Sequence, residues 1–135
     1  MSAKRRPFLD TNILIYAFAA DDPRSDLAEA LVAAGGVISV QVLNEFVNVS
    51  RRKLGREWAD IENAVGVLRD LLDAPIPLTV ELHDAAIALA RDHGFAFYDA
   101  LIVAAASQSG CVTLYSEDMQ HGQTIDGLTI RNPFA

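Results

Sequence analysis

Short apolar stretches alternate with longer amphipathic ones along most of the chain. Compact apolar runs end at Asp10 and occupy residues 37–40, 111–116 and 128–134, which predicts short strands. The proline-marked residues 74–80 are typical of a short or edge strand. Apolar residues recur every three or four positions through 21–36, 41–55, 57–73, 81–94 and 97–110, which predicts five helices. Residues 13–20 are interpreted as helical or irregular, and residues 117–127 as a loop.

Local signals mark several helix ends. Asp22 is placed to cap the helix of residues 21–36, with Pro23 as its first helical residue and Gly35 and Gly36 ending it. The helix of residues 97–110 is apolar on almost every side, so we expect it to be buried.

Alternating strands and helices favour a particular fold class. They predict an α/β protein with three layers, α/β/α, around a central and mostly parallel sheet. The length of 135 residues fits one domain, residues 1–135, and a composition of 51% hydrophobic and 21% charged residues is typical of a globular protein.

Several protein classes are disfavoured by what the sequence lacks. The chain has no apolar run of the roughly 20 residues that a membrane span requires. Its first residues also lack the apolar core of a signal peptide, so we expect a cytoplasmic location. The single cysteine, Cys111, has no partner for an internal disulfide and is interpreted as a small buried hydrophobic residue.

The overall charge is acidic. Eleven Lys and Arg against eighteen Asp and Glu give a net charge of -7, which disfavours nucleic-acid binding through overall basic charge. Two local basic clusters remain as candidate phosphate contacts, Lys4 to Arg6 and the segment "RRKLGR" at 51–56, although such clusters are more often simply solvated faces.

Acidic residues gather where the predicted strands end. Asp10 ends the first strand, and Glu45 lies early in the helix after the second. Asp99 opens the apolar helix, while Glu117 and Asp118 follow the strand of residues 111–116. In open α/β sheets ligands bind outside the carboxyl ends of the strands. We therefore expect four separate segments to bring carboxylates to one edge of the sheet.

Glu45 also belongs to an unusual polar stripe. Gln41, Asn44, Glu45 and Asn48 follow the spacing i, i+3, i+4, i+7, so one helix face offers a carboxylate among amides.

Carboxylates that share a small site repel one another, so they must take up protons or bind a multivalent cation. Oxygen ligands suit Mg2+ and Mn2+. Each acid alone has a structural explanation: Asp10 as a helix cap, Glu45 as a solvated residue and Asp99 as a favourable charge at a helix N-terminus. Their joint placement favours a metal site.

At these residues the sequence resembles the PIN-domain ribonucleases, and among them the VapC-like toxins of bacterial toxin-antitoxin pairs. The resemblance covers nearly the whole chain. It rests on four segments in order: "LDTNILIYA" with Asp10, "ISVQVLNEF" with Glu45, "FYDALIVAAA" with Asp99 and "LYSEDMQHG" with Asp118.

The resemblance implies an endoribonuclease that depends on Mg2+ or Mn2+ and leaves 5'-phosphate and 3'-hydroxyl ends. Its catalytic and metal-binding residues would be Asp10, Glu45, Asp99 and Asp118. Its supporting residues would be Thr11, Asn12, Ser116 and Glu117, of which Glu117 is an alternative ligand to Asp118, and its RNA contacts would be Arg51, Arg52 and Lys53. The implied partners are RNA, a VapB-like antitoxin that covers the acidic groove, and a second copy of the chain.

Other readings fit less well. Asn12 stands where haloacid-dehalogenase-type phosphotransferases have a second Asp, Asn12 and Leu14 stand where metal-adhesion domains have serines, and no Lys follows Lys53 as response-regulator receivers require. The main alternative is a catalytically silent PIN-like module that binds RNA or protein, which the presence of all four acids disfavours.

Overall fold

The computed structural model describes residues 6–135, so Lys4 and Arg5 of the first basic cluster lie outside the described residues. The sheet has the strand order β1-β2-β4-β3. Strands β1 (Phe8–Leu9), β2 (Thr113–Tyr115) and β4 (Leu128–Arg131) pair in parallel, while β3 (Thr124–Ile125) pairs antiparallel with β4. The expectation of a central, mostly parallel sheet is confirmed.

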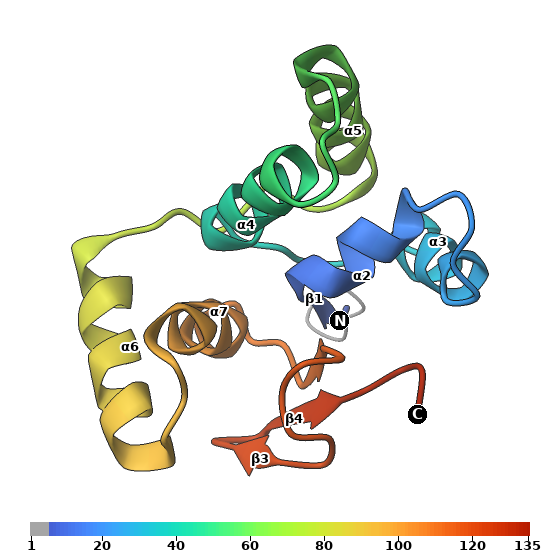
Figure 1. The fold of residues 1–135 in the computed structure, drawn as a ribbon. Coiled ribbons are helices and arrows are strands. Elements are labelled where there is room, and N and C mark those ends of the chain that lie inside the picture. Colours follow the sequence, from blue (N-terminus) through green and yellow to red (C-terminus); the bar gives the residue numbers. More distant parts are fainter. Residues whose placement is uncertain (1–5) are drawn as a thin grey trace.

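Six helices accompany the sheet in the described part of the chain. They are α2 (Thr11–Ala17), α3 (Ser25–Ala33), α4 (Val40–Arg52), α5 (Trp58–Leu71), α6 (Val80–His93) and α7 (Phe97–Gln108). Figure 1 shows α6 and α7 side by side on one flank of the sheet and α2 and α3 on the other. No helix among the described residues is long and apolar enough to cross a membrane.

The core lies between the sheet and its helices. Phe8, Leu114 and Ile130 on the three parallel strands are fully buried. Every residue of α7 from Ala100 to Ala106 is buried as well, which confirms the expectation from its apolar pattern. Because four of these seven residues are alanines, α7 can approach the core closely. The helix fixes the position of Asp99 in its first turn.

Two predicted strands form only isolated parallel bridges. Residues 37–40 pair with β1 only through Val37, and α4 already begins at Val40 because Ser39 caps it through its hydroxyl, which accepts from the Val42 amide at 3.2 Å. The proline-marked segment 74–80 contributes one bridge, between Ile76 and Ser39. The prediction of regular strands in these two segments is wrong, because the helix caps end the extended conformation early.

The remaining differences are local. Helix α3 begins at Ser25 rather than at Pro23, because the Asp22 side chain accepts from the Arg24 amide at 2.8 Å and holds a turn before the helix. Part of the predicted loop 117–127 is strand β3, which turns into β4 through Asp126 and Gly127, both with positive φ. Helix α6 ends at His93, as expected, with Gly94 in the left-handed conformation.

Candidate metal centre

Asp10 lies at the end of β1, buried at the carboxyl edge of the sheet, with 3% of its surface exposed. Its two carboxylate oxygens are held by different donors: Oδ1 accepts from the Thr11 amide at 2.7 Å, and Oδ2 accepts from the Ser116 hydroxyl at 2.6 Å. The first bond makes Asp10 the N-cap of α2. The expected cap is therefore present, but it satisfies only one of the two oxygens.

Ser116 connects the first acid to the loop that carries the last one. It is fully buried just after β2, and its hydroxyl accepts from the amides of Asp118 at 3.2 Å and Met119 at 3.3 Å while it donates to Asp10. Because β1 and β2 are adjacent parallel strands, this serine joins the two loops that leave their carboxyl ends.

Hydrogen bonds also orient Glu45 and Asp118. The Thr11 hydroxyl donates to Glu45 Oε1 at 3.2 Å, and the Gln41 amide donates to Glu45 Oε2 at 2.9 Å. The Asn12 amide donates to Asp118 Oδ2 at 3.0 Å. Thus the two residues that follow Asp10 each contact the carboxylate of a distant segment, one on α4 and one after β2.

The negative charges of neighbouring acids affect the pKa of Asp10 and of Asp99. Burial raises the pKa of Asp10 to about 7, opposed by the hydrogen bonds from Ser116 and Thr11 and reinforced by the negative charges of Glu45 and Asp99. Burial also raises the pKa of Asp99, and the charges of Glu45 and Asp118 add to the shift. Asp99 and Asp118 line one hollow of about 240 Å³. Each acid therefore lies within electrostatic reach of others in the set.

Glu117 is engaged differently from its neighbour. Arg24 donates to both of its oxygens, at 3.0 and 2.8 Å, and the Tyr16 hydroxyl donates to one of them. Burial acts against ionisation, but these bonds hold the pKa of Glu117 below its usual range. The guanidinium of Arg24 stacks 3.8 Å from the centre of the Tyr16 ring. Sequence reasoning did not single out Tyr16 and Arg24, since no short motif links them to Glu117.

The basic cluster lies at the end of α4. Arg51, Arg52 and Lys53 are exposed. Arg52 follows Glu45 by seven positions on α4, which places the cluster roughly 10 Å from Glu45 along the helix axis. The Arg51 guanidinium lies 5.0 Å from the centre of the Trp58 ring. The structure thus brings the four acids together and leaves the cations at a distance from them.

The donor chemistry suits a hard divalent cation. All four acids offer carboxylate oxygens. Burial, reinforced by neighbouring negative charges, raises the pKa of Asp10 and Asp99, so a bound cation would stabilise their ionised forms. Among residues 6–135, no three acidic, histidine or cysteine side chains lie close enough together to hold a metal ion as they stand. Mg2+ keeps several of its waters and is commonly bound through only one or two carboxylates.

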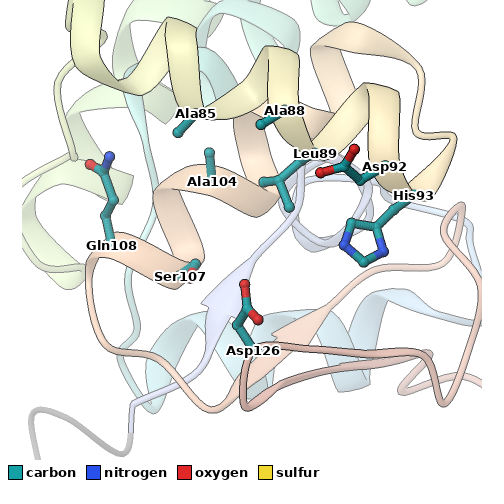
Figure 2. A pocket seen from close by; sticks show the side chains of 9 residues that line it. All are labelled: Ala85, Ala88, Leu89, Asp92, His93, Ala104, Ser107, Gln108 and Asp126. Atoms are coloured by element: carbon teal, nitrogen blue, oxygen red, sulfur yellow. The ribbon is translucent and has the colours of Figure 1, made fainter.

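A separate hollow of about 280 Å³ lies between α6, α7 and the β3–β4 turn. Figure 2 shows Asp92, His93 and Asp126 at its rim and alanine side chains along its walls. None of the four acids lines it, and Asp92 is paired with Arg91 at 2.8 Å. This hollow is therefore not part of the acidic site.

The raised pKa of Asp10 predicts how stability depends on pH. The folded chain holds this proton more tightly than an ordinary aspartate with a pKa of 3.8. Raising the pH through the interval from about 4 to 7 should then cost up to about 4 kcal/mol of folding free energy. In chelator, wild type should therefore unfold at lower denaturant concentration at pH 8 than at pH 5.

Asp10→Asn should remove most of this pH dependence, whatever its effect on stability at any one pH. The matched control is Asp70→Asn, which changes an exposed aspartate on α5 and should keep the wild-type slope. Equal slopes for wild type and Asp10→Asn would show that Asp10 does not carry the effect.

Known proteins can now be compared with this fold and site. A family model described as "PIN domain" matches residues 8–124. No curated protein matches the chain.

Three solved structures share the fold. VapC20 of Mycobacterium tuberculosis, described as a toxin that cleaves the sarcin-ricin loop, has a TM-score of 0.68 at 24% identity, over 82% of this chain and 88% of that one. A toxin-antitoxin complex from Klebsiella pneumoniae has a TM-score of 0.71 at 21% identity, over 94% and 97% of the two chains. VapBC2 from Rickettsia felis, bound to DNA from its promoter, has a TM-score of 0.66 at 22% identity, over 93% and 96%.

Proposed function

The chain belongs to the PIN-domain family, and from this premise we propose that it is a divalent-metal-dependent endoribonuclease, the toxin of a VapBC-type toxin-antitoxin pair. The observation that carries the proposal is the convergence of acids from four separate segments: Ser116 binds Asp10, Thr11 binds Glu45, Asn12 binds Asp118, and Asp99 lines one hollow with Asp118. A phosphodiester is anionic, so this cluster can receive it only together with a cation.

The residues that would hold Mg2+ or Mn2+ follow from their positions. Asp10 and Asp99, whose pKa values are raised by burial and by neighbouring acids, would hold the principal ion. Glu45 and Asp118 would complete its shell, bind a second ion or orient a water molecule. A bound ion would offset the charge of the substrate, lower the pKa of a water molecule and stabilise the leaving oxygen.

The chain's own contribution is to hold these carboxylates in place before the substrate arrives. The Thr11 amide and the Ser116 hydroxyl fix Asp10 from opposite oxygens. Asn12 accepts from the Glu117 amide at 3.2 Å while it donates to Asp118, so one side chain positions both the loop and its acid. Such supporting bonds govern how well ligands bind a metal.

The substrate and partners follow from the family and from the fold relatives. VapC20 is described as a toxin that cleaves the sarcin-ricin loop, and we propose that this chain acts on RNA. Arg51, Arg52 and Lys53, at the end of α4, would contact its phosphates. The relatives from Klebsiella pneumoniae and Rickettsia felis are complexes, which supports a VapB-like antitoxin as partner; a homodimer is also proposed.

Induced expression in bacteria tests the proposal. The wild-type chain should arrest growth and produce discrete RNA fragments that begin with a 5'-phosphate. Asp99→Asn, expressed at the same level, should do neither. Growth arrest by both forms without RNA cleavage would instead favour the silent module that acts by binding.

Thr11→Val should reduce metal-dependent RNA cleavage by about 10- to 100-fold, because it removes the hydroxyl that donates to Glu45 and keeps the side-chain shape. Thr11→Ser retains the hydroxyl and should stay near wild type. The measurement is kcat/KM on one short RNA at saturating Mg2+. A loss in Thr11→Ser equal to that in Thr11→Val would show that the hydroxyl does not account for the effect.

A further inference from the structure

A second binding feature lies next to the acidic site, on the polar stripe of α4. Gln41, Asn44, Glu45 and Asn48 face a hollow of about 330 Å³, and Tyr98 of α7 forms its other wall. A volume of this size falls in the range in which proteins hold small ligands. Glu45 belongs both to this hollow and to the acidic cluster, so the two sites adjoin.

Tyr98 is the aromatic element of the hollow. It is 64% exposed, although large aromatic side chains usually bury most of their surface, and it directly precedes Asp99 in the first turn of α7. A flat ring in this position can stack with a flat ligand that reaches the acids.

The amides provide the polar element. The Gln41 amide is committed to Glu45 at 2.9 Å. Asn44 and Asn48 are exposed, and no hydrogen bond within residues 6–135 engages their side chains. Each amide carries both donors and an acceptor, which is the combination that matches the edge of a nucleobase.

We propose that this hollow binds one unstacked nucleobase of single-stranded RNA, next to the phosphodiester that is cut. The base stacks on the Tyr98 ring, and its edge is hydrogen-bonded by the amides of Asn44 and Asn48. This inference rests on the proposed nuclease function and adds to it the residues that determine where the RNA is cleaved.

The charge of the hollow favours a base over other parts of RNA. Its lining has one acid, Glu45, and no Lys or Arg, so a phosphate there would be repelled. A base carries no charge and can bond to amides. The phosphates on either side can then lie toward the acidic cluster and toward the basic end of α4.

Titration with free nucleosides tests the hollow separately from catalysis, since a nucleoside has no phosphate and cannot be cut. In nuclear magnetic resonance spectra of the full chain in chelator, at least one of adenosine, guanosine, cytidine and uridine should shift the side-chain amide signals of Asn44 and Asn48 saturably. Tyr98→Ala should abolish these shifts, while Tyr98→Phe, which keeps a ring, should retain them. Unmoved signals with all four nucleosides would overturn the inference, whether or not the chain cleaves RNA.

Cleavage kinetics provide the second readout. Tyr98→Ala should raise KM for a short single-stranded RNA by about tenfold or more with little change in kcat. Asn48→Ala should weaken the preference for the base beside the cut by about tenfold. The control Asn63→Ala removes an exposed amide from α5, outside this hollow, and should change neither.

The outcomes separate the two proposals. A wild-type chain that cuts RNA, with Tyr98→Ala and Asn48→Ala matching it in KM and in cleavage sites, would overturn the base site and leave the nuclease standing. Nucleoside binding without any metal-dependent cleavage would support the base site and contradict the proposed nuclease activity. A hollow used for protein contact would show unmoved nucleoside signals, and so would also count against the inference.

Discussion

Asp10→Asn is expected to lower RNA cleavage by about a thousandfold or more, because metal-assisted stabilisation of the transition state is worth several kcal/mol. Asp10 is the most buried of the four acids and is held at both oxygens, so its loss cannot be replaced by another side chain. Single-turnover cleavage of one RNA, with enzyme in excess over a range of Mg2+ concentrations, measures the effect.

The Mg2+ series distinguishes a lost ligand from a damaged fold. A lost ligand should also shift half-maximal activity to higher Mg2+, whereas a damaged fold would lower the unfolding midpoint in chelator. Asp70→Asn serves again as the control, since it removes an exposed carboxylate on α5. Cleavage activity of Asp10→Asn within tenfold of wild type would show that Asp10 is not an essential metal ligand.

Ser116→Ala is expected to have the second largest effect, on both stability and activity. It would leave Asp10 without the hydroxyl that lowers its pKa, and the Asp118 and Met119 amides without an acceptor. Buried groups left unpaired in this way cost about 1–3 kcal/mol of stability. Cleavage should fall by about 10- to 100-fold, since ligand positioning is lost.

Ser50→Ala is a closely matched control for this prediction. Ser50 is also fully buried, but its hydroxyl has no hydrogen-bond partner in the described part of the chain. Its removal should therefore be neutral or slightly stabilising, with cleavage unchanged. The measurements are the urea unfolding midpoint and the rate of RNA cleavage of Ser116→Ala and Ser50→Ala. Equal losses in both would mean that any hole at a buried serine is harmful, and that Ser116 has no special role.

Much of the site could be anticipated from the chain itself. Asp10, Asp99 and Asp118 each follow a strand or open a buried helix, and the carboxyl edge of a parallel sheet brings such positions together. Glu45 could be placed on the same edge because α4 follows the segment that pairs with β1. What the sequence could not show is the network between them, since the bond from Ser116 to Asp10 joins residues 106 positions apart.

Local backbone chemistry explains most of the errors in the fold. Residues 37–40 and 74–80 have strand-like composition, but Ser39 and Thr79 each cap the helix that follows and end the extended backbone. The hairpin of β3 and β4 carried a readable signal, because Asp126 and Gly127 form a dipeptide that is typical of tight hairpin turns. Strand β3 itself, with two residues, is too short to produce an alternating pattern that distinguishes it from a loop.

The role of Glu117 illustrates a further limit. The sequence places two adjacent acids after β2, and the family resemblance favours Asp118 with Glu117 as the alternative ligand. Tyr16 of α2 and Arg24 of the segment after it both bind the carboxylate of Glu117, whereas within residues 6–135 only the Asn12 side chain binds the carboxylate of Asp118. We therefore assign the metal-binding role to Asp118 and a loop-anchoring role to Glu117, as proposals.

The proposed function requires that the four acids bind a metal ion and that RNA is cleaved at this site. Its most direct test is incubation of a total RNA pool with purified protein in Mg2+, Mn2+ or EDTA, beside Asp10→Asn and Asp99→Asn. We expect discrete RNA fragments with either metal, none in EDTA and none with either variant. Cleavage that persists in EDTA, or is equal in wild type and variants, would contradict it, as would a folded, metal-binding chain that cuts no RNA.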